Sequence, residues 1–136
     1  LHVKRHSFPT RRSSDLTCAV TLGSGNIVGA NVINVTVACT TITYTVGGTV
    51  VGLPAGDSVT LRNNGGNDLI VSANGAFTFT APITDGAAFT VTVQTQPTTP
   101  NRLCLVTSGN GTVAGSNVTN VAVDCVSNTL FIDGFE

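Results

Sequence analysis

Residues 18–39 read CAVTLGSGNIVGANVINVTVAC, and residues 104–125 read CLVTSGNGTVAGSNVTNVAVDC. The two stretches align without a gap at an offset of 86 residues, and 12 of their 22 positions are identical. Self-similarity at a fixed offset marks a repeat architecture. The offset is the length of an independently folding β-sandwich rather than of a solenoid unit. The duplication therefore predicts a chain built from β-sandwich repeats.

Each copy of the duplicated segment ends in alternating apolar residues, which predict a strand over residues 32–37 and over residues 118–123. The Gly-, Ser- and Asn-rich stretch before each strand predicts a turn. We therefore expect each copy to form a hairpin or a short meander, with its two cysteines near the open end.

The four cysteines are Cys18, Cys39, Cys104 and Cys125. None belongs to a CxxC motif, and the chain has no His beyond residue 6 to complete a zinc site. Cross-strand neighbours in a hairpin lie close enough for a disulfide, so we expect Cys18–Cys39 and Cys104–Cys125. Each bond would stabilise the fold by about 3 kcal/mol in the chain-entropy model. Paired cysteines indicate an oxidising compartment, with free or metal-bound thiols as the alternative.

One complete unit lies between the two copies. Short strand-like runs alternate with turn signals at the spacing of an all-β, antiparallel β-sandwich. We expect Phe77, Phe79 and Phe89 to point into its core. The expected strands cover residues 44–50, 58–62, 68–72, 76–80 and 88–94.

Four motifs follow one another in this unit: GTVVGL at 48–53, VTL at 59–61, NGAFTF at 74–79 and DGAAFTVTV at 85–93. Their order resembles a transthyretin-like sandwich, as in Cna-B-like modules, and Ig-like sandwiches share such motifs. The whole unit also resembles Cys-containing repeats found in tandem in secreted Gram-negative bacterial proteins. The resemblance implies export and a modular architecture rather than an activity.

Residues 1–16 differ in composition from the rest, because they hold both His residues, the only Lys and three of the five Arg. Residues 6–16 resemble the translation of a short-read sequencing adapter, so we expect residues 1–16 to be non-native. The alternative is a disordered basic arm. Without this segment the net charge changes from −1 to −4, and no basic patch for nucleic acid remains.

The duplication also predicts the organisation of the remaining chain. We expect residues 17–39 to be the closing hairpin of a truncated repeat, and residues 40–127 to be a complete repeat. Residues 128–136 form a C-terminal tail whose ending LFIDGFE resembles a short tail of some exported proteins. A sorting role is one interpretation of the tail, and docking of Phe131 and Phe135 on the domain is the other.

Residues 63–68 are the one candidate for a ligand loop. Asn63, Asn64, Asn67 and Asp68 offer oxygens of the kind that Ca²⁺ prefers, but only one of the four is charged. A calcium loop is therefore weighed against ordinary turn residues. We expect Arg62 and Arg102 to be solvated surface charges, and we expect no cofactor.

The residue types predict a structural role rather than catalysis. Beyond residue 16 there is no His or Lys to activate the many Ser and Thr hydroxyls, and no apolar run is long enough for a membrane helix. We expect a spacer or adhesive stalk of an exported protein, extracellular or at the cell surface, whose partners are neighbouring repeats. The alternative is a module that binds carbohydrate or another surface ligand, appended to an upstream enzyme. Such a platform usually exposes aromatic side chains, whereas Tyr44 is the only Tyr and Trp is absent.

Overall fold

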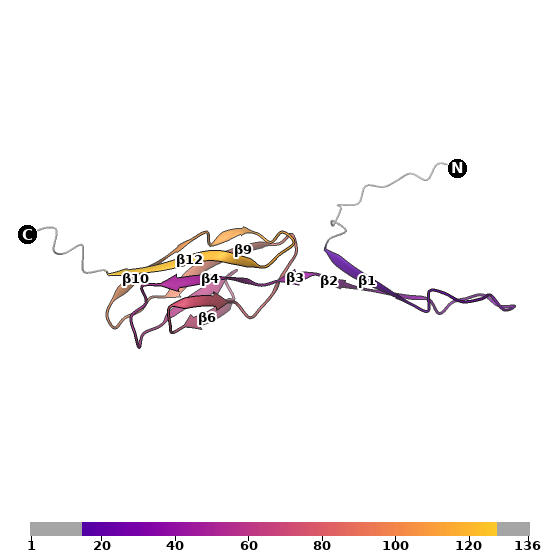
Figure 1. Cartoon of the computed structure of the whole chain (residues 1–136), viewed down its shortest axis with the longest axis horizontal. Coiled ribbons are helices and arrows are strands. Elements are labelled where there is room, and N and C mark those ends of the chain that lie inside the picture. The colour runs from indigo at the N-terminus through magenta and orange to yellow at the C-terminus, as the bar shows by residue number, and fades with distance from the viewer. Residues whose placement is uncertain (1–14, 128–136) are drawn as a thin grey trace, which may run out of the picture. The chain divides into compact units, whose positions relative to one another are not determined.

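The computed structural model describes residues 15–127, and every regular element in that range is a β-strand (Figure 1). The chain divides between Ile42 and Thr43 into two compact units. The first contains one disulfide hairpin, and the second contains a β-sandwich. Each unit is described by itself.

The hairpin of the first unit pairs β1 (Leu16–Thr21) with β2 (Thr36–Thr41) in antiparallel register, so that Cys18 lies opposite Cys39. The connecting residues 22–35 form no strand. Every residue from 16 to 41 is exposed. The hairpin thus consists of backbone pairing, a disulfide and a long loop, without a core of its own.

The second unit contains two four-stranded sheets. The first has the strand order β10-β12-β4-β7, and the second has the order β11-β9-β5-β6. A short pair, β3 (Thr43–Tyr44) and β8 (Ile83–Thr84), stands apart from both sheets. The strands of the first sheet are β4 (Val46–Val51), β7 (Gly75–Thr78), β10 (Arg102–Thr107) and β12 (Val118–Ser127). Those of the second are β5 (Val59–Asn63), β6 (Asn67–Val71), β9 (Ala88–Thr95) and β11 (Asn110–Thr112).

The core of the sandwich receives side chains from both sheets because apolar residues alternate along each strand. Val59 and Leu61 of β5 are fully buried, and so are Val121 and Val123 of β12, at 1% exposure or less. The remaining buried apolar residues are Val46, Val50, Leu53, Phe77, Phe79, Phe89, Val91, Cys104, Val113 and Cys125. This arrangement confirms the predicted all-β sandwich, including the inward direction of the three phenylalanines.

Strand β4 lies between β7 and β12 and pairs with β12 in parallel, with Gly48 opposite Val121. All other strand pairs in the described range are antiparallel. Gly48 is required at this point, because a Cβ placed there would collide with the backbone carbonyl oxygen of Val121. The sequence predicted an antiparallel sandwich, and this one parallel pair is the departure from it.

The strand predicted over residues 32–37 is wrong over its first four residues, since β2 begins at Thr36. Its counterpart was predicted over residues 118–123, and β12 does begin at Val118. Among the first four residues of β12, Val118 and Val121 pair with Val46 and Gly48 of β4, with an irregularity in the register between them. Local alternation alone does not hold the equivalent residues of the first hairpin in a strand.

Candidate functional site

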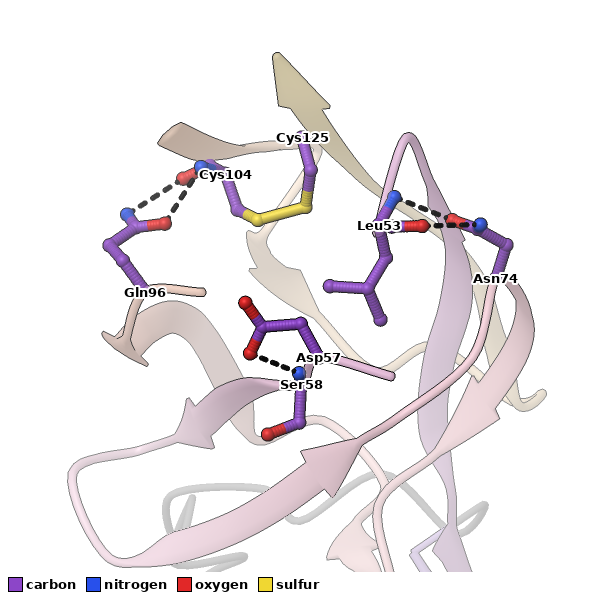
Figure 2. Close-up of a disulfide and its surroundings, with 7 residues drawn as sticks. All are labelled: Leu53, Asp57, Ser58, Asn74, Gln96, Cys104 and Cys125. Carbon is purple, nitrogen blue, oxygen red and sulfur yellow. Dashed lines mark hydrogen bonds between the residues drawn. A yellow bond between two sulfur atoms is a disulfide. The ribbon is translucent and has the colours of Figure 1, made fainter. Parts of the chain in front are cut away.

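The disulfide Cys104–Cys125 joins β10 to β12 inside the sandwich, and both cysteines are 2% exposed. Figure 2 shows Gln96 beside it, with its side-chain amide facing the backbone of Cys104. The Cys104 N–H donates to Gln96 Oε1 at 2.7 Å, and Gln96 Nε2 donates to the Cys104 carbonyl at 3.1 Å. Strand β10 is the outer strand of its sheet. Gln96 therefore covers a free sheet edge at the disulfide.

Asn74 makes an equivalent two-bond contact with the backbone of Leu53 (Figure 2). The Leu53 N–H donates to Asn74 Oδ1 at 2.8 Å, and Asn74 Nδ2 donates to the Leu53 carbonyl at 2.9 Å. Leu53 is buried at 5% exposure. The side-chain amide thus satisfies both backbone groups where the chain leaves β4, and it holds Leu53 in the core.

Asp57 ties two loops of the sandwich together. Its carboxylate accepts the Thr99 N–H at 2.6 Å and the Ser58 N–H at 2.8 Å, the second of which is drawn in Figure 2. These bonds, that from Thr99 first, hold the pKa of the Asp57 carboxyl below its ordinary value of 3.8. The charged form of Asp57 is therefore the form that favours the folded loop arrangement.

The turn between β11 and β12 is fixed to the sandwich by hydrogen bonds to Asp85 and Thr45. Asp85 is 8% exposed, and its Oδ1 accepts the Gly115 N–H at 2.8 Å. The Thr45 N–H donates to Asn117 Oδ1 at 3.0 Å. Val113, which precedes these contacts, is fully buried. The second copy of the duplicated segment thus attaches to the sandwich through polar anchors as well as apolar packing.

Strand β11 attaches the same segment to the second sheet. It pairs with β9, and Gly111 lies opposite Phe89. The Val91 N–H donates to the carbonyl of Gly109 at 2.6 Å, where a Cβ would collide with the backbone of Val91. Because β12 belongs to the first sheet and β11 to the second, one copy of the duplicated segment closes the sandwich along both sheets.

Asn63 and Asn64, two residues of the predicted calcium loop, direct their side-chain oxygens toward the backbone of β9. Asn63 is 2% exposed, and its Oδ1 accepts the Thr90 N–H at 3.3 Å. Asn64 Oδ1 accepts the same N–H at 2.8 Å, and Asn64 Nδ2 donates to the Ala88 carbonyl at 3.1 Å. Asn67 is half-buried at the start of β6. These contacts give the loop a structural role, which is to join the β5–β6 turn to β9.

Asp68, the charged member of that loop, forms an ion pair with Arg62. Arg62 Nε and Nη2 donate to the two carboxylate oxygens at 2.6 and 2.8 Å. This bidentate contact lowers the pKa of Asp68 and raises the pKa of Arg62. Arg62 is thus a partly exposed surface charge, as expected, with a side chain that is 30% exposed, and it is paired with Asp68. The β5–β6 register that places Arg62 opposite Asp68 is the signal that sequence reasoning missed.

In the first unit, the disulfide Cys18–Cys39 joins β1 to β2, and both cysteines are exposed. The two arms of the loop beyond it, residues 22–26 and 31–35, enclose an open hollow of about 510 Å³. The pairing of all four cysteines agrees with the sequence expectation, and the described residues contain no free thiol.

Two further properties concern the described residues alone. Residues 15–127 contain no group of three or more His, Cys, Asp or Glu side chains that could hold a metal ion. They also contain no helix that is long and apolar enough to cross a membrane. The interpretations of residues 1–14 and of the tail 128–136 lie outside the described residues.

Two disulfides in so short a chain are typical of an oxidising, extracellular-type environment. Comparison of the chain with models of protein families, with curated proteins and with solved structures found no match.

Proposed function

We propose that this chain is a structural, non-catalytic part of an exported protein, in which β-sandwich repeats of one kind follow one another as a spacer. The observation that carries the proposal is the duplication of the disulfide hairpin. In both copies the cysteines pair across the strands, and the flanking residues have the same register. A chain that carries the closing hairpin of a sandwich twice is organised like an array of repeats.

The surface chemistry supports a spacer over an enzyme. Beyond residue 16 the chain has no His or Lys, and the ionisable groups of the sandwich with shifted pKa values take part in a loop contact and a cross-strand ion pair. Asp57 accepts backbone N–H groups, and Asp68 pairs with Arg62. Both carboxylates are thus engaged in contacts that hold the fold.

Export is supported by the disulfides and by the low content of charged residues. Non-reducing peptide mapping of the protein isolated from its natural host should find Cys18–Cys39 and Cys104–Cys125. Free thiols at all four positions would contradict export, since reducing compartments keep cysteines unpaired.

The alternative function, binding of carbohydrate or another surface ligand, requires aromatic side chains that face solvent. In the described range, Phe77, Phe79 and Phe89 are buried in the core, and Tyr44 is half-buried. The sandwich therefore offers one partly accessible aromatic ring at most among its described residues. This favours the spacer.

A glycan array probed with the full chain tests the two functions against each other. A spacer gives no saturable binding at micromolar concentration. Saturable binding that is lost in Tyr44→Ala and kept in Tyr44→Phe would contradict the spacer and establish a ligand platform at Tyr44.

A further inference from the structure

We propose that the first hairpin carries a docking face for a sandwich unit of the same kind as residues 43–103, supplied by a preceding unit of the same polypeptide. The acceptor face, as we call it, consists of Val20, Val32, Val35, Val37 and the disulfide Cys18–Cys39. The four valines are between 49% and 59% exposed. This inference rests on the proposed repeat function and adds to it the partner and its mode of binding.

The positions at which the two hairpins differ provide the first argument. Nine of the ten differing positions are exposed in the second hairpin, and the tenth, buried Val113, corresponds to the similar Ile27. Sequence differences have thus accumulated where the second hairpin meets solvent and not where it meets the sandwich. The first hairpin keeps the residues that a sandwich would contact. The ten differing positions in the second copy are Leu105, Ser108, Asn110, Thr112, Val113, Ala114, Ser116, Thr119, Ala122 and Asp124.

The shared valines show what the acceptor face is shaped to bind. Val121 and Val123 are at most 1% exposed against the sandwich, whereas their counterparts Val35 and Val37 are 49% and 59% exposed. Leaving such side chains in water forgoes the favourable burial of apolar surface. Val20 lies opposite Val37, two residues along each strand from the Cys18–Cys39 pair, and exposed apolar side chains that are buried in the equivalent hairpin indicate an interaction surface.

The shared polar residues indicate, independently of the valines, that the first hairpin is shaped to bind a sandwich. Gly115 donates its N–H to Asp85, and Asn117 accepts the Thr45 N–H, so both are anchors to the sandwich. Their counterparts Gly29 and Asn31 are unchanged. The φ angle of Gly29 is 72°, against 74° for Gly115. The first hairpin therefore presents the same donor and acceptor for an Asp and a backbone N–H of a partner unit.

The partner must also carry a strand like β4. In the second unit, β12 approaches β4 so closely that only Gly48 fits opposite Val121. The equivalent parallel pairing would place Val35 opposite the corresponding glycine of the partner. The acceptor face thus selects a strand with Gly at this position and Val two residues later, as in Gly48-Thr49-Val50.

The hollow between residues 22–26 and 31–35 marks where the partner core would enter. In the second hairpin the equivalent arms contain β11 and the start of β12, which belong to opposite sheets with the sandwich core between them. In the first hairpin the same arms enclose about 510 Å³ of open space.

The covalent order of the second unit identifies the source of the partner. Residues 43–103 directly precede Cys104, so the sandwich strands and the hairpin that closes them are consecutive in one chain. In a second copy of this chain, β4 already pairs with its own β12. A preceding unit of the same polypeptide therefore fits the acceptor face without displacing an existing strand.

An insertion in the full chain tests the inference. A duplicate of residues 43–103 is placed between Thr17 and Cys18, which reproduces the connection found at Leu103–Cys104. Hydrogen exchange of the amides of residues 29–38 is then compared with the unmodified chain. We expect exchange to slow by about 100-fold or more, because these amides would exchange only when the inserted unit unfolds. Unchanged exchange in a soluble, folded product would overturn the inference.

A pair of matched variants of the inserted copy identifies the binding mode. Gly48→Val in the duplicate puts a side chain where the hairpin backbone must approach, and it should abolish the added protection. Thr49→Val in the duplicate introduces the same side chain at the neighbouring exposed position and should preserve it. Protection that survives Gly48→Val would overturn the parallel pairing.

A hairpin exchange keeps the inference testable if the insertion does not fold. In the full chain, the ten differing positions of residues 104–125 are changed to the residues of the first hairpin. The sandwich should still unfold cooperatively, with its folded-to-unfolded ratio reduced about 5- to 30-fold by the overpacking Val113→Ile change. Loss of the cooperative transition would show that the first hairpin does not fit such a sandwich.

The mass of the unmodified chain in solution decides between the two sources of the partner. A monomer with rapidly exchanging amides at residues 29–38 agrees with a preceding unit as the partner. A dimer in which these amides are already protected would overturn that source and identify a second copy as the occupant. Neither result changes the glycan-array outcome, so failure of the inference and failure of the proposed function are distinguishable.

Discussion

The two disulfide hairpins of this chain have the same local structure and differ in what packs against them. At the 86-residue offset, β1 and β10 have equivalent bounds, and both pair with their partner strands in the same register. Leu22 and its counterpart Ser108 both adopt positive φ angles, of 56° and 54°. The hairpin and this bend therefore have the same local structure with and without a core, although Leu22 and Ser108 differ.

The elements that differ between the hairpins are those that require a sandwich. Strand β11 exists because it pairs with β9, and the first hairpin has no strand at the equivalent residues 24–26. The start of β12 pairs with β4 at Val118 and Val121, whereas the equivalent residues 32–35 form no strand. Alternating apolar residues thus provide the capacity for a strand, and a partner determines its length.

Removal of each disulfide should give the largest difference between the hairpins. Cys104→Ala with Cys125→Ala should lower the free energy of unfolding of the sandwich by about 3 kcal/mol or more, because a buried crosslink and its packing are lost. Cys18→Ala with Cys39→Ala should change the same quantity by less than about 0.5 kcal/mol. Urea unfolding followed by circular dichroism measures both, and equal losses would contradict the comparison.

Truncation of equivalent valines should give the next largest difference. Val123→Ala removes a fully buried side chain and should cost about 2 kcal/mol, whereas Val37→Ala removes one that is 59% exposed and should cost less than about 0.5 kcal/mol. The same urea unfolding experiment measures the free energy of unfolding of both variants. A cost of Val37→Ala close to that of Val123→Ala would mean that the first hairpin is already packed.

Acid should destabilise the sandwich and leave the hairpin unchanged. We expect this effect to be smaller than those of the disulfide and valine substitutions. Residues 16–41 contain no ionisable side chain other than the disulfide-bonded cysteines. The pKa of Asp57 is lowered in the folded sandwich, so its contribution is present above pH 3.8 and is lost as the pH falls through the lowered value. Thermal unfolding over about three pH units, from pH 5 to pH 2, measures this pH dependence, because the range spans the ordinary pKa of Asp. Asp57→Asn should make the dependence shallower, and an identical dependence in that variant would exclude Asp57 as the cause.

The sequence predicted those parts of the fold that depend on local pattern. The alternation of Val59 with Leu61 and of Phe77 with Phe79 was sufficient to place these side chains in the core. The parallel pairing of β12 with β4 was not predictable, because it joins strands more than 60 residues apart that no turn connects.

The candidate site was predictable only in its covalent part. Equal cysteine spacing and hairpin geometry predicted both disulfides. The clamp of Gln96 on Cys104 depends on a loop that returns to a sheet edge, and no local motif signals it. The burial of Asn63 also followed from tertiary contact with β9, since Asn in a turn ordinarily faces water.

Hydrogen exchange of the unmodified chain tests the central comparison most directly. The amides of residues 122–127 and of residues 36–41 occupy equivalent positions and differ in whether a sandwich covers them. We predict that residues 36–41 exchange about 100-fold faster, because they open locally while residues 122–127 open with the whole sandwich. Equal protection of the two strands in a monomeric chain would contradict the account.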